Sequence, residues 1–158
     1  MTKHRGFTLV EILIVVIILG ILAAIVIPQF SSASNDARES ALTSDLQTLR
    51  SQTELYNIQH MDHYPDMQSA DSGANWVADT GNFTARLTGR TNQYGQIGTD
   101  PNTYPFGPYL QKFPINAVNK KSTIRVDGAA AGAGSDGWHF NSTNGRVSAD
   151  DSAAHAAL

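Results

Sequence analysis

The sequence contains no cysteine among its 158 residues. This absence excludes disulfide bonds, thiolate zinc sites, iron–sulfur clusters and cysteine nucleophiles. Charged residues are also scarce, because they make up 16% of the chain against roughly 25% in a typical soluble domain. The formal net charge is −3. We therefore expect no nucleic-acid partner, since contacts to phosphates require a basic surface.

Motifs of common enzyme classes are missing as well. The sequence has no GxxxxGKS/T, HExxH or GxSxG pattern, so nothing indicates nucleotide binding, zinc hydrolysis or serine hydrolysis. We expect a protein that is not an enzyme. Its length allows one globular domain of ordinary size.

The longest apolar run lies near the N-terminus. Residues 12–27 (ILIVVIILGILAAIVI) contain no polar side chain, and extending the run back to Phe7 adds only Thr8 and Glu11 as polar residues. At about 1.5 Å per residue, a helix of this length covers the roughly 30 Å hydrocarbon core of a bilayer. The segment therefore predicts a transmembrane helix, with the lipid bilayer as one partner.

Basic residues flank this run at one end. Lys3 and Arg5 precede it, and the next Lys or Arg is Arg38. The positive-inside rule then places the N-terminus in the cytoplasm and the rest of the chain across the membrane. A cleaved secretory signal has a shorter apolar region of about 7 to 15 residues. A plain single-pass anchor explains the length and the flanking charge, but it does not explain Glu11.

Glu11 is an acidic residue inside an apolar segment. A charge in hydrocarbon costs on the order of 2.5–3.5 kcal/mol on insertion scales, and such residues tend to pair. Cleavage between Gly6 and Phe7 would create an α-amine four residues before Glu11. That amine is a suitable partner within one helix or, alternatively, from a neighbouring subunit, where the charge would set the register of assembly.

Residues 6–11 (GFTLVE), which follow a short basic leader and precede an apolar run ending at Pro28, resemble the type IV prepilin signature. Gly20 also matches this signature. The resemblance implies that a membrane prepilin peptidase cleaves after Gly6 and that Phe7 becomes N-methylated.

The same resemblance implies roles in assembly. The apolar helices of the family form a filament core, in which Glu11 would neutralise the amine of an incoming Phe7. The helix would loosen between Gly20 and Pro28 in the filament, and both residue types have low helix propensity.

Residues 29–63 change to an amphipathic pattern. Apolar and small residues recur there at spacings of three and four, which predicts a helix, and Pro65 should end it. One helix is thus expected from about Phe7 to about Met61, or roughly 80 Å. Its second half is expected to pack against the C-terminal domain. The recurring positions are Phe30, Ala33, Ala37, Ala41, Leu42, Leu46, Leu49, Thr53 and Tyr56.

Residues 64–158 are rich in Gly, Pro, Asn, Asp and Ser, which indicates long loops and a few short strands. Candidate strands are 123–127, 137–141 and 145–148, and we expect them to form a small antiparallel sheet packed on the helix. Trp138, Phe140 and Val147 are the expected core residues. The class is therefore α+β, and the resemblance implies the pilin fold; we expect a flexible C-terminal tail.

Short segments of this domain look like those of type II secretion pseudopilins, especially the major pseudopilin. They are residues 63–66 (HYPD), 107–114 (GPYLQKFP), 137–140 (GWHF) and 145–147 (GRV). Major pilins usually close their C-terminal loop with a disulfide, so the lack of cysteine favours a pseudopilin. One departure is residues 115–119 (INAVN), where the major pseudopilin typically shows Asp-Pro-Trp-Gly.

The resemblance also implies a calcium loop near the C-terminus. Calcium binds six to eight oxygens, which carboxylates and backbone carbonyls can supply. The alternative, which we favour, is that the acidic residues are solvated loop and tail residues, because Asp is common in turns. Calcium is the one cofactor considered, and its candidate ligands are Asp127, Asp136, Asp150 and Asp151.

These observations predict a prepilin leader (1–6), a transmembrane and filament-core helix (7–28), an amphipathic helix (29–63) and a periplasmic head (64–158). The expected function is a structural subunit of a type II secretion pseudopilus. Expected partners are copies of itself, minor pseudopilins or pilins, prepilin peptidase, and an inner-membrane platform with a cytoplasmic ATPase. The alternatives are a pilin of a surface pilus for adhesion, twitching motility or DNA uptake, and an uncleaved membrane-anchored periplasmic binding module.

Overall fold

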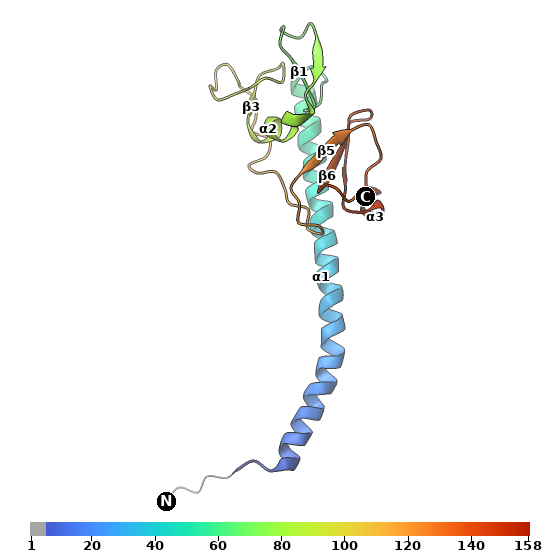
Figure 1. Cartoon of the computed structure of the whole chain (residues 1–158). Helices are drawn as coiled ribbons and strands as arrows, with labels where there is room; N and C mark the ends of the chain where they lie inside the picture. The colour runs from blue at the N-terminus through green and yellow to red at the C-terminus, as the bar shows by residue number, and fades with distance from the viewer. Residues whose placement is uncertain (1–5) are drawn as a thin grey trace, which may run out of the picture. The chain divides into compact units, whose positions relative to one another are not determined.

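The computed structural model describes residues 6–158, so residues 1–5 of the expected leader, with Lys3 and Arg5, lie outside the described chain. Helix α1 spans Leu9–Gln59 and is drawn as one continuous helix in Figure 1. This agrees within two residues at each end with the expected helix. The chain divides into two compact units that meet between Arg38 and Glu39, and α1 contributes to both.

The first unit consists of the N-terminal part of α1. Every large apolar side chain from Leu9 to Ile27 is more than half exposed. Among the described residues, α1 is the helix that is long and apolar enough to cross a membrane. The helix contains Pro28 without interruption. These side chains therefore need a cover from outside the chain, which a bilayer or neighbouring helices would provide.

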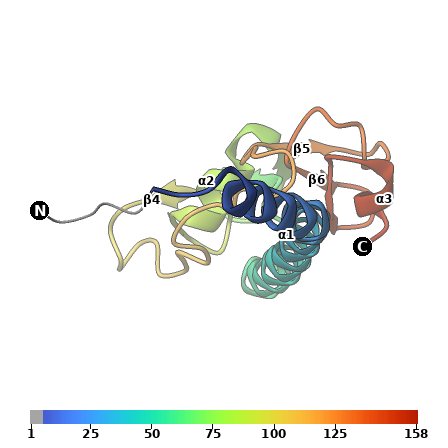
Figure 2. The ribbon, with the colours of Figure 1, turned by 90° about the horizontal axis from the view of Figure 1, so that it is seen from below.

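The second unit is built on the C-terminal part of α1. Leu42, Leu46, Leu49, Thr53 and Tyr56 are buried along one side of the helix, as the spacing of three and four predicts. The expectation was wrong for the earlier recurring positions, because the head core begins at Leu42 and leaves them exposed; they are Phe30, Ala33, Ala37 and Ala41. Figure 2 shows α2 and β4 on one side of this part of α1, and β6 and α3 on the other. The rest of the core comes from these flanking segments, and its buried apolar members are Phe83, Leu87, Leu110, Phe113, Trp138, Phe140, Val147 and Ala149.

The strands of the second unit form three small sheets. Strands β1 (Met67–Ser69) and β2 (Trp76–Ala78) pair antiparallel, as do β3 (Arg90–Thr91) and β4 (Ile97–Gly98). Strands β5 (Ile124–Asp127), β6 (Trp138–Asn141) and β7 (Arg146–Ala149) form the third sheet, in that order. The short helices are a 3₁₀ turn at Thr80–Asn82, α2 at Phe83–Thr88 and α3 at Ala153–Ala156.

The third sheet is mixed, so the expectation of an antiparallel sheet was wrong for one of its two pairings. Strands β6 and β7 are antiparallel, but β5 and β6 are parallel, with Arg125 beside His139. The physical reason is the loop formed by residues 128–137. Instead of making a tight turn, this loop returns to the start of β5 before β6 begins, and such a return is what parallel pairing requires. The three predicted core residues Trp138, Phe140 and Val147 are buried, as expected.

The C-terminal residues are also more regular than the flexible tail that we expected. Ser152 caps α3 by accepting a hydrogen bond from His155 N at 3.2 Å, in the usual manner of an N-cap serine. Arg50 of α1 donates from Nη1 to the carbonyl oxygen of Leu158 at 3.1 Å. The segment is therefore tied to the helix rather than extended away from it.

We predict that Trp138→Ala lowers the unfolding free energy of the head by about 3–5 kcal/mol, as large-to-small substitutions in a core do. The substitution would empty a fully buried site and remove the hydrogen bond from Trp138 Nε1 to the Pro114 carbonyl at 3.0 Å. Denaturant unfolding of the full chain in detergent micelles measures the effect. Trp76→Ala is the matched control, because Trp76 is half-buried. Equal stability of the two variants would contradict the prediction.

Candidate functional site

Glu11 closes the first turn of α1 through Thr8. Glu11 Oε2 accepts hydrogen bonds from Thr8 N and Thr8 Oγ1, both at 2.8 Å, and Glu11 N donates to Thr8 Oγ1 at 3.3 Å. This reciprocal arrangement is a capping box, which satisfies backbone N–H groups that have no partner at a helix start. It explains why α1 begins at Leu9. The sequence signal for this cap is the spacing Thr-x-x-Glu, which was not among the predicted features.

The Gly6–Phe7 junction precedes the helix and is accessible. Both residues lie outside regular structure and are exposed, Phe7 by 82%. No atom outside the neighbouring residues lies within 4 Å of the position that a Cβ would take on Gly6. The expected cleavage point between Gly6 and Phe7 therefore lies in an exposed, non-helical segment. The expected pairing of Glu11 with a new Phe7 amine stays a prediction, because that amine exists only after cleavage.

Gly20 and Pro28 both lie inside the continuous helix. Pro28 has no N–H, so the Ala24 carbonyl lacks its usual donor four residues later. Gly20 has open space around it and carries the low helix propensity of glycine. The loosening that the family resemblance implies for the filament stays a prediction.

Comparison with known proteins finds a matching motif and several similar chains. The family model described as "Prokaryotic N-terminal methylation motif" matches residues 1–27. A type II secretion system core protein G from Dickeya chrysanthemi is 38% identical over 112 residues, which are 71% of this chain and 61% of the relative. The chain is thus similar to members of the type IV pilin-like family.

Other relatives point to the same group of pseudopilins. Core protein G from Pseudomonas aeruginosa is 29% identical over 136 residues, which cover 85% of this chain and 92% of the relative. The one from Vibrio cholerae is 30% identical over 114 residues, 72% of this chain and 65% of the relative. The matched part thus spans less than two thirds of several relatives. No solved structure matches this pilin-like chain.

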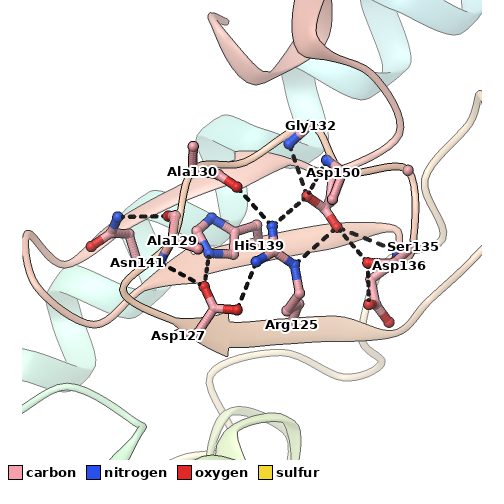
Figure 3. Close-up of polar contacts among 12 residues, drawn as sticks. Arg125, Asp127, Ala129, Ala130, Gly132, Ser135, Asp136, His139, Asn141 and Asp150 are labelled. Carbon is pink, nitrogen blue, oxygen red and sulfur yellow. Dashed lines mark hydrogen bonds and ion pairs between the residues drawn. The ribbon is translucent and has the colours of Figure 1, made fainter.

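The four candidate calcium ligands fall into two groups in the structure of this pilin-like head. Asp127 and Asp150 are joined by Arg125, and Asp136 reaches Asp150 through Ser135 (Figure 3). Asp151 belongs to a different cluster: its carboxylate accepts from Asn116 Nδ2 at 2.8 Å and lies 2.5 Å from His155 Nδ1. Within residues 6–158, no three His, Cys, Asp or Glu side chains gather as metal ligands would.

Asp150 is the centre of the first group. Its side chain is fully buried, which corrects the expectation of a solvated tail residue. Oδ1 accepts from Arg125 Nη2 at 2.9 Å, Gly132 N at 2.8 Å and Ala133 N at 3.1 Å. Oδ2 accepts from Arg125 Nε at 3.3 Å, Ser135 Oγ at 3.1 Å and Asp136 N at 3.4 Å. The carboxylate therefore holds loop 128–137 against the sheet.

These contacts set the charge states of the group. Burial alone would raise the pKa of Asp150, but hydrogen bonds from Arg125, Ala133 and Gly132 outweigh it and lower that pKa to about 2. The hydrogen bond with His139 is the largest cause that lowers the pKa of Asp127, also to about 2. Both carboxylates are therefore ionised at neutral pH, and the carboxylates in turn raise the pKa of Arg125.

Two arginines were missed as key residues by sequence reasoning. Arg125 links the acidic residues, as described above, and Arg86 on α2 is fully buried. Arg86 donates to the carbonyls of Gly95, Pro65 and Asp79 at 2.7, 2.9 and 2.9 Å, and it also pairs with the Asp79 carboxylate. A sequence gives no local signal for such burial, since Arg is usually exposed.

We predict that the stability contributed by Asp150 is lost in acid. Its folded-state pKa of about 2 lies below the ordinary value of 3.8, so the contribution is present above about pH 4 and disappears as the pH falls toward 2. At neutral pH, Asp150→Asn should lower the unfolding free energy by about 2 kcal/mol, which is the energy equivalent of this pKa difference.

Thermal or denaturant unfolding of the full chain at several pH values tests this. The Asp150→Asn effect should shrink between pH 4 and 2, whereas the control Asp136→Asn in the same loop should have little effect at any pH. An Asp150→Asn effect that does not change with pH would show that the lost packing, rather than the charge, matters.

Proposed function

We propose that this chain is a type II secretion pseudopilin that polymerises through its N-terminal helix into a periplasmic pseudopilus that drives protein export. The observation that carries the proposal is the unpartnered apolar first part of α1, in which every large side chain from Leu9 to Ile27 is more than half exposed. This segment directly follows an accessible Gly6–Phe7 junction. The similarity to type II secretion system core protein G supports the choice of filament.

The proposed cycle begins in the inner membrane. The N-terminus lies in the cytoplasm and the head in the periplasm, because Lys3 and Arg5 precede the apolar run. A prepilin peptidase removes residues 1–6, and Phe7 is N-methylated. An assembly platform with a cytoplasmic ATPase then extracts the subunit from the bilayer into the filament, together with minor pseudopilins. The subunit contributes shape and rigidity rather than chemistry.

We expect N-terminal mass spectrometry of the protein from its native membrane to find a chain that starts at methylated Phe7. Gly6→Leu should leave the leader attached, because it alters the residue next to the cleaved bond. Gly20→Ala is the control, since a Cβ at Gly20 meets no atom within 4 Å, and it should be processed normally. An intact Met1 in the wild-type protein would overturn the filament proposal in favour of a plain anchor.

We also predict that Glu11→Ala inserts into the membrane but assembles poorly, because it lacks the charge proposed to pair with the Phe7 amine. This variant also loses the capping box with Thr8. Glu11→Gln separates the two roles, because glutamine also serves in capping boxes but carries no charge.

Filament yield, measured by shearing and immunoblotting with a membrane-fraction control, tests this prediction. Glu11→Gln should assemble as poorly as Glu11→Ala, and the control Glu39→Ala, on an exposed part of the same helix, should assemble normally. Normal filaments from Glu11→Gln would show that the cap rather than the charge is needed.

A further inference from the structure

The C-terminal loop of the head raises the question of which cation holds its carboxylates together. The family resemblance implies calcium, which takes six to eight oxygen ligands at about 2.3–2.6 Å. Of the three linked candidate ligands, Asp127, Asp136 and Asp150, the last is the most deeply buried. The donors around its carboxylate show whether a metal ion fits this loop.

The surroundings of Asp150 do not fit a metal ion. A carboxylate has about four acceptor positions on its two oxygens, and here six N–H and O–H donors point at them. Three of these donors are backbone N–H groups of loop 128–137, which carry partial positive charge and would face an ion bound by Asp150. A calcium ion at this carboxylate would have to displace most of these hydrogen bonds.

Arg125 already occupies the position between the acidic groups (Figure 3). Its guanidinium binds both oxygens of Asp150, Asp127 Oδ2 at 2.6 Å and the Ala130 carbonyl at 2.9 Å. Two carboxylates and a backbone carbonyl are the kinds of group that a calcium ion collects. The pairing of Arg125 with His139 in the parallel β5–β6 ladder fixes this arginine at the base of the loop.

We propose that Arg125 is a built-in cation of the C-terminal loop, so that this head closes the loop without a metal ion. The loop is then organised in two steps. Arg125 compensates the buried charge of Asp150, and Asp150 in turn orders the backbone at Gly132, Ala133 and Asp136. The planar fork of arginine suits this role, because it can bind two acceptors of one carboxylate and still reach others.

The conformation of the loop is consistent with this closed arrangement. Gly132 has a φ of 91°, and a Cβ there would lie 2.8 Å from Ala153 Cα. Gly134 N donates to the Asp150 carbonyl at 2.6 Å, and Asp150 N donates to the Gly137 carbonyl at 3.2 Å. The loop therefore contacts the Asp150 segment through both main chain and side chain.

The first test uses the unmodified full chain in detergent micelles. We expect the same melting temperature in millimolar calcium chloride and in excess EDTA, and no heat of calcium binding by isothermal titration calorimetry. A melting temperature that rises with calcium and returns with EDTA would overturn the proposal. This test does not depend on filament assembly, so it can fail while the proposed function stands.

The second test examines the charge of Arg125. Arg125→Gln should lower the melting temperature and move the acid unfolding transition to higher pH, because Asp150 would lose its charged partner. Arg125→Lys should recover part of both losses, since it restores the charge without the fork. Arg146→Gln, on the exposed end of the same sheet, is the control. An Arg125→Gln variant that matches this control in both measurements would refute the proposal.

Discussion

The burial of one side of α1 is the interaction on which the rest of the head depends. The strands of the head have at most four residues, and its largest sheet has three strands. Sheets of this size are too small to form an independent core. The helix supplies a fixed apolar surface at Leu42, Leu46, Leu49 and Tyr56. The buried aromatic residues of the head belong to the same core cluster, so loops of irregular shape can be held in one arrangement; they are Phe83, Phe113, Trp138 and Phe140.

A loop-rich domain also needs hydrogen-bond partners for the backbone groups of its loops, and here buried ionic side chains provide them. Loops carry backbone N–H and C=O groups that have no partner in a ladder, and burying such groups without partners is costly. Arg86 supplies donors to three carbonyls on one side of α1. Asp150 supplies acceptors to three N–H groups of loop 128–137. Each charge has an ionic partner, Asp79 and Arg125 respectively, which compensates for removing it from water.

Local patterns in the sequence predicted much of this structure. The spacing of apolar residues predicted α1, and three apolar residues of the candidate strands, Trp138, Phe140 and Val147, were correctly expected in the core. The parallel pairing of β5 with β6 could not be predicted in this way, because it depends on the path of loop 128–137, which has no periodicity. The burial of Arg86 and Asp150 and the role of Arg125 beside Asp150 also escaped prediction, since each depends on contacts between distant segments.

The division of α1 between two environments has a consequence for the proposed assembly. The buried apolar residues of the head core begin at Leu42, whereas the large apolar side chains from Leu9 to Ile27, and Phe30 beyond them, are exposed. Transfer from a bilayer into a filament would therefore replace lipid by neighbouring helices around the first part of α1 without changing any core contact of the head. A subunit can then fold its head completely while still anchored in the membrane, and filament growth need not use or overcome the folding free energy of the head. In this arrangement the first part of α1 provides the polymerisation surface, while the second part and its buried charges keep the head in one shape throughout.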